Sequence, residues 1–116
     1  MDLSIALTDD ERHACRRAVV YVRGIAEGLR GSSDKDAAAC DRYASTLAAI
    51  SQAPGPVQLQ AQQKIDVEQA SFLLEGIRNG LENADLDTAV GIVQRDIERL
   101  NDLVFRYNSE AGRRSG

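Results

Sequence analysis

The sequence predicts an all-α protein, an antiparallel up-down four-helix bundle made of two tandem, pseudo-equivalent helical hairpins. The composition favours helices, because alanine, leucine, arginine, glutamine and glutamate are abundant and the only two prolines are Pro54 and Pro56. Apolar residues recur at helical spacing in four segments joined by short turns. A glycine-containing motif also occurs twice, as GIAEGL at residues 24–29 and as GIRNGL at residues 76–81. These observations indicate one helical domain over residues 1–110 and a flexible tail over 111–116.

The first helix is expected to run from Asp9 to Arg30. Thr8 is a candidate N-cap, and Glu11 three residues later completes the pattern of a capping box. Gly31 follows the last periodic residue, where glycine commonly terminates helices. The predicted core stripe alternates steps of three and four residues: Cys15, Ala18, Val22, Ile25 and Leu29.

The second helix is expected to begin after Ser33 and to end before Pro54, so the first hairpin covers about 8–52. Ser33 is a candidate N-cap, and acidic residues in the first turn suit the positive end of the helix dipole. The predicted inward residues are mostly small: Ala37, Cys40, Ala44, Leu47 and Ile50.

The two cysteines are expected at different heights in this hairpin. At 1.5 Å per residue, Cys15 lies about 24 Å from the turn and Cys40 about 12 Å. That separation excludes a disulfide, so both are predicted to be buried thiols that pack as small apolar side chains.

The second hairpin is predicted over about 56–108, and no strand is expected anywhere. Pro56 suits the first position of a third helix that runs to Glu82. Asp85 is a candidate cap for a fourth helix that ends near Asn108. The inward residues of the third helix are Val67, Ala70, Leu74, Ile77 and Leu81. Those of the fourth helix form a heptad seam: Leu86, Val90, Val93, Ile97, Leu100, Val104 and Tyr107.

The repeated motif indicates an internal duplication. Gly24 and Gly76 are 52 residues apart, and the Asp-x-Asp elements that begin at Asp34 and Asp85 are 51 apart. Two copies fit a closed bundle or a pair of hairpins better than an open solenoid, which needs three or more repeats.

The glycines are predicted to lie on a second face that points away from the core stripes. Glycine costs about 1 kcal/mol in a helix interior, and its missing side chain lets another backbone come close. One interpretation is that these helices are buried on two sides or that the glycines only loosen the helix ends. The other is a contact surface for an oligomer or a partner, formed by Val20, Tyr21, Gly24, Gly28, Ile65, Phe72, Gly76, Gly80 and Phe105.

One flank of the first helix is predicted to face a partner through Arg12, Arg16, Arg23 and Arg30. The fourth helix carries acidic residues instead, so a neighbouring copy of it or an acidic partner would suit this flank. Nucleic acid is a disfavoured alternative, because the chain has a formal charge of −4 and few aromatic residues near the arginines.

No cofactor, metal or catalytic site is expected. His13 is the only histidine, and two cysteines with one histidine are too few for a zinc site. A phosphotransfer role for His13 is a further alternative. In histidine phosphotransfer domains, however, a small residue clears room where Arg17 stands here.

The composition and the absence of catalytic patterns favour a non-enzymatic interaction module: an adaptor, assembly subunit, chaperone or inhibitor that forms a homodimer and binds protein. No secretory signal or membrane-spanning run is apparent, so a cytoplasmic protein without membrane contact is expected. The alternatives are a nucleic-acid-associated subunit and a histidine phosphotransfer-like signalling domain.

Overall fold

A computed structural model describes residues 2–115, apart from the side chain of Ser115. Four helices and two short strands follow one another along the chain. In order they are β1 (Leu3–Ile5), α1 (Asp9–Leu29), α2 (Asp34–Gln52), β2 (Val57–Leu59), α3 (Ala61–Asn83) and α4 (Asp87–Ser115). Because the four helices pack against one another and account for most of the described chain, the predicted all-α fold class is confirmed.

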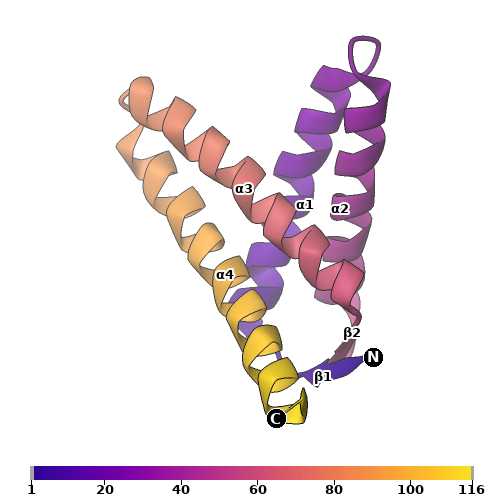
Figure 1. Ribbon diagram of the computed structural model, residues 1–116. Helices are drawn as coiled ribbons and strands as arrows, with labels where there is room; N and C mark the ends of the chain where they lie inside the picture. The colour runs from indigo at the N-terminus through magenta and orange to yellow at the C-terminus, as the bar shows by residue number, and fades with distance from the viewer. Residues whose placement is uncertain (1, 116) are drawn as a thin grey trace.

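The helices form two hairpins that together have the shape of a V (Figure 1). α1 packs with α2 and α3 with α4, while α1 contacts α4 and α2 contacts α3 across the two hairpins. The hairpins lie together near the β1–β2 ribbon and diverge toward their turns (Figure 1). The closed up-down bundle expected from the sequence is therefore not confirmed.

The β1–β2 ribbon corrects the prediction that the chain has no strand and that a helix begins at Pro56. The two strands pair antiparallel, with the partners Leu3–Leu59, Ser4–Gln58 and Ile5–Val57. The apolar residues of both strands are buried and the central polar residues are exposed. Each segment is only three residues long, so its alternation gives no clear strand signal until the distant partner is in place.

The start of α1 confirms the predicted capping box. Thr8 Oγ1 accepts a hydrogen bond from the Glu11 backbone at 3.1 Å, and Glu11 Oε1 accepts one from the Thr8 backbone at 2.8 Å. Gly31 lies beyond the helix with a φ of +87°, a conformation that glycine adopts at low cost. α3 starts at Ala61, 52 residues after Asp9, which is the offset of the repeated glycines. The duplication itself stays a prediction.

α4 is longer than predicted and starts later. It begins at Asp87, because Asp85, the expected cap, adopts a left-handed φ of +59° in the turn. The segment expected as a tail is helical as far as Ser115, and residue 116 lies outside the described residues. Glu110 pairs with Arg113 at 2.8 Å and with Arg114 at 3.2 Å, contacts at helical spacing that favour this last turn.

The core follows the predicted stripes near the ribbon and weakens toward the two turns. All five inward residues predicted for α2 are buried. In contrast, Ile25, Leu29, Ile77 and Leu81 are only partly buried, and Leu86 is 52% exposed. The reason is the V shape, since each helix near a turn has only its hairpin partner beside it (Figure 1).

Both cysteine thiols are expected to resist modification in the folded protein. Cys15 and Cys40 are buried and free, as predicted. Burial raises the pKa of Cys15 from 9.0 to about 12. Folding thus favours the protonated thiol, and this contribution to stability is lost as the pH rises from about 9 to about 12. In mildly alkaline buffer, a colorimetric thiol reagent should react slowly with the native protein and rapidly with both thiols after unfolding. Rapid reaction of either thiol in the native protein would contradict the observed burial.

Candidate interaction site

Three buried carboxylates fix the two hairpins against each other. Each belongs to one hairpin and is bound by an arginine of the other. The ion pairs are Arg17–Asp96, Arg106–Glu11 and Arg42–Asp66. Their nitrogen–oxygen distances are 2.6 Å, 2.7 Å and 3.3 Å. Asp66 also accepts a hydrogen bond from the Thr46 hydroxyl at 2.7 Å.

Asp96 lies outside the seam predicted for the fourth helix, yet its side chain is fully buried because Arg17 reaches across from α1 to neutralise it. Buried charges need such partners, so these pairs fix the relative placement of the outer faces.

The predicted second faces of α1 and α3 lie in solvent. The exposed positions are His13, Arg17, Val20, Gly24 and Gly28 on α1, and Ile65, Gln69, Phe72, Gly76 and Gly80 on α3. A Cβ atom added at any of the four glycines would meet nothing within 4 Å. Burial of these helices on two sides is therefore wrong, and no contact inside the described chain requires these glycines. Tyr21 differs from the rest of the set, because it is partly buried and packs against the core.

Phe72 and Phe105 lie on one groove between α3 and α4. Their residues are 65% and 71% exposed, and the groove has a volume of about 330 Å³. Ser71 donates a hydrogen bond to Asn101 at 2.8 Å and joins the two helices there. The other lining residues are Glu68, Glu75, Val104 and Asn108. The sequence predicts that Phe72 and Phe105 belong to one contact surface, and the structure places both residues on the same groove.

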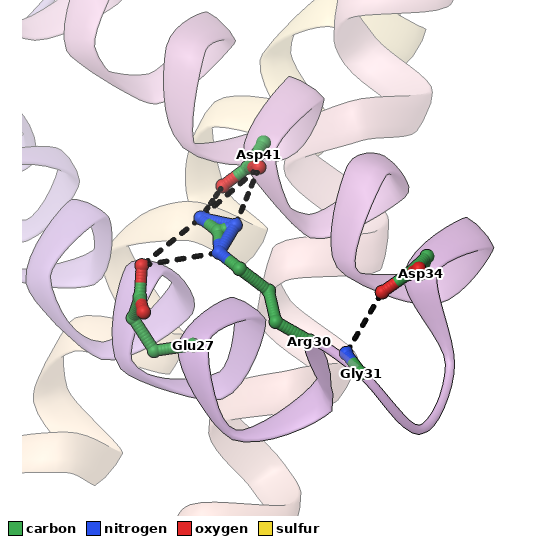
Figure 2. A network of polar contacts seen from close by, with 5 residues as sticks. All are labelled: Glu27, Arg30, Gly31, Asp34 and Asp41. Atoms are coloured by element: carbon green, nitrogen blue, oxygen red, sulfur yellow. Dashed lines mark hydrogen bonds and ion pairs between the residues drawn. The ribbon is translucent and has the colours of Figure 1, made fainter.

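Two of the four arginines predicted to face a partner are engaged within the first hairpin. Arg12 donates hydrogen bonds to the carbonyls of Ala53 and Gly55 in the loop after α2. Arg30 pairs with Glu27 at 3.1 Å and with Asp41 at 3.3 Å, where the chain turns from α1 into α2 (Figure 2). These two side chains therefore support the hairpin.

The two remaining arginines of this flank are available to a partner. Arg16 and Arg23 are exposed, and neither side chain has a hydrogen-bond or ion-pair partner among residues 2–115. The acids of α4 suit them less well than expected, because Asp96 is buried and Asp102 lies 3.7 Å from Arg99.

His13 lies on a groove of about 600 Å³ between α1 and α4. Arg17, Arg95 and Arg99 line the same groove, together with Asp10, Ile92 and Asp96. Arg17 is held by Asp96, and Arg99 lies 3.7 Å from Asp10. Within residues 2–115, no other group hydrogen-bonds to the His13 ring. The groove thus combines an exposed imidazole with arginines that are partly neutralised.

The part of the chain that the structure describes has neither a metal-binding cluster nor a membrane-spanning helix. No group of three or more histidine, cysteine, aspartate or glutamate residues there has the arrangement of a metal site. None of its helices combines the length and apolar character needed to cross a membrane.

Comparison with known proteins assigns neither a family nor a function. The chain matches no protein-family model, no curated protein and no solved structure.

Proposed function

We propose that this protein is a non-enzymatic interaction module that binds other protein chains through preformed helix faces. The observation that supports it most is the position of the two phenylalanines. They are the only ones in the chain, and both lie exposed on one groove. Burying a phenylalanine side chain contributes about 1.5–3 kcal/mol, yet the core contains neither of them.

The groove has the composition of a binding surface. Two aromatic rings provide an apolar centre, and Glu68, Glu75 and Asn108 provide a polar edge. Protein interfaces commonly combine an aromatic centre with a polar rim, and aromatic residues often contribute much of the binding energy. Because both rings are carried by packed helices, a partner would not have to order a loop, which lowers the cost of association.

Such a module acts by occlusion or by scaffolding. An adaptor, assembly subunit, chaperone or inhibitor needs a stable surface and no reacting groups. Self-association is part of the proposal, since exposed apolar surface of this kind commonly marks an interface between chains.

Replacing Phe72 and Phe105 together by serine is expected to weaken binding more than tenfold, which corresponds to about 1.4 kcal/mol or more. Stability should change little, because both side chains are already in solvent. Sedimentation velocity over a concentration series measures self-association, and co-purification from the native cell measures binding of other proteins. Leu86→Ser is the matched control, since Leu86 is exposed but lies outside the groove. Equal binding by the double variant and the wild type would count against the proposal.

A further inference from the structure

The outer flanks of α1 and α3 carry opposite charges at equivalent positions. Arg16, Arg23 and Arg30 recur every seven residues in α1. The residues 52 positions later are Glu68, Glu75 and Glu82, which recur every seven residues in α3. The same offset relates Val20 to Phe72 and Gly24 to Gly76. The flank is therefore positively charged in α1 and negatively charged in α3. Both helices have an apolar residue and a glycine at equivalent positions of this flank.

The structure places the apolar residue and the glycine of both sets in solvent; Arg16 and Arg23 are exposed, and Glu68 and Glu75 are half-buried. α1 and α3 start 52 residues apart, and matched inward positions are buried in both, as for Ala18 and Ala70. Val20 is 70% exposed and Phe72 is 65% exposed. We call Arg16, Val20, Arg23 and Gly24 the arginine face, and Glu68, Phe72, Glu75 and Gly76 the glutamate face.

The central charges on both faces are largely free within the chain. Among residues 2–115, the side chains of Arg16, Arg23 and Glu75 have no hydrogen-bond or ion-pair partner. Glu68 is paired with Lys64 at 2.8 Å. The outer arginine of the series, Arg30, is already engaged by Glu27 and Asp41 (Figure 2). The charges available to a partner are therefore those next to Val20 on α1 and next to Phe72 on α3.

We propose that the arginine face of one copy docks onto the glutamate face of a second copy, so that α1 packs against the neighbour's α3. This inference rests on the proposed function and names the partner of the glycine-containing faces. Two arginine faces would repel each other, as would two glutamate faces, so the contact joins unlike faces. The partner is a second copy because this chain carries both halves of the complement.

The helix geometry suits this contact. Both charge pairs are spaced seven residues apart. In an antiparallel contact Arg16 can therefore reach Glu75 while Arg23 reaches Glu68. In a parallel contact Arg16 can reach Glu68 while Arg23 reaches Glu75. Charges repeated every seven residues beside an apolar seam set pairing and orientation in coiled coils. Gly24 and Gly76 add no side chain between the helices, so Val20 and Phe72 can approach closely. Each copy presents both faces, so association either closes into a ring or continues as a chain.

A pair of charge-reversed variants tests the proposal. Arg16→Glu with Arg23→Glu makes both faces acidic, and Glu68→Arg with Glu75→Arg makes both basic. Sedimentation velocity should show that each variant alone associates at least tenfold more weakly than the wild type. An equimolar mixture of the two should associate again, and so should a chain carrying all four substitutions. Added salt should weaken every one of these contacts.

The control for the arginine-face variant is Lys35→Glu with Arg95→Glu, which makes the same change in net charge as Arg16→Glu with Arg23→Glu at exposed positions outside both faces. Circular dichroism confirms that each variant is folded. Wild-type association by either reversed variant alone, or no association in the mixture, overturns the proposed contact. A wild type that stays monomeric at all concentrations also overturns it. The proposed function then stands if another protein binds through Phe72 and Phe105, and it fails if none does.

Discussion

Replacing Arg17 by alanine is expected to destabilise the protein by about 3 kcal/mol, although 49% of the Arg17 side chain is exposed. The reason lies in the partner, because Asp96 is fully buried and receives two nitrogens of the Arg17 guanidinium at 2.6–3.0 Å. Without Arg17 the carboxylate is left without its ion-pair partner. The loss should fall at the lower end of the range for a broken buried pair, since the adjoining groove admits water.

Chemical denaturation followed by far-ultraviolet circular dichroism measures this loss. Arg16→Ala is the matched control, since Arg16 is the preceding residue, is exposed and has no partner in the described chain. It should change the free energy of unfolding by less than about 0.5 kcal/mol. Adding Asp96→Ala to Arg17→Ala should recover part of the loss, because no buried charge then remains. Equal effects of Arg17→Ala and Arg16→Ala would refute the assigned role.

The Arg17–Asp96 pair also bears on the proposed function. It joins α1 of one hairpin to α4 of the other, while Arg42 and Asp66 join α2 to α3. The outer faces of α1 and α3 belong to different hairpins, so these pairs help to determine how the faces point relative to each other. Loosening a pair should therefore weaken the proposed association between copies before the protein unfolds.

Local signals in the sequence are sufficient to predict the bounds of the two helices in the first hairpin. The capping box of Thr8 and Glu11, the terminating Gly31 and the disfavoured helix before Pro54 place α1 and α2 to within a residue of their observed bounds. Each of these signals depends on residues a few positions apart, so the sequence contains all the necessary information.

Features that depend on distant residues were not predicted. Pro56 suits a helix start, yet Val57 to Leu59 pair with β1 and delay α3 to Ala61. Asp96 lies outside the predicted seam, and its burial depends on Arg17, which is 79 residues away in the sequence. The sequence assigns Phe72 and Phe105 to one contact surface, but the groove between them depends on how α3 packs against α4. In contrast, the helical period predicts that the glycines lie away from the core stripe. Whether a neighbouring helix covers that face depends on the tertiary packing, and the structure shows these positions exposed.

Replacing Leu59 by alanine is expected to cost about 2–5 kcal/mol, as much as a leucine in the middle of a helical core. Leu59 is 1% exposed, and it pairs directly with Leu3, which is 2% exposed. The ribbon is short, but its apolar side chains belong to the same buried cluster as the inward residues of all four helices. Truncating Leu59 leaves a cavity at the end of the molecule where the two hairpins meet (Figure 1).

Gln58→Ala tests whether this loss comes from burial, because Gln58 is the adjacent residue on the exposed side of the strand. It should cost less than about 0.5 kcal/mol in the same denaturation experiment. The Leu3→Ala and Leu59→Ala losses should not be additive, since the two side chains share one site. If Leu59→Ala were as mild as Gln58→Ala, the ribbon would be a peripheral addition. A large loss means that β1 and β2 hold the starts of both hairpins together, since β1 precedes α1 and β2 precedes α3.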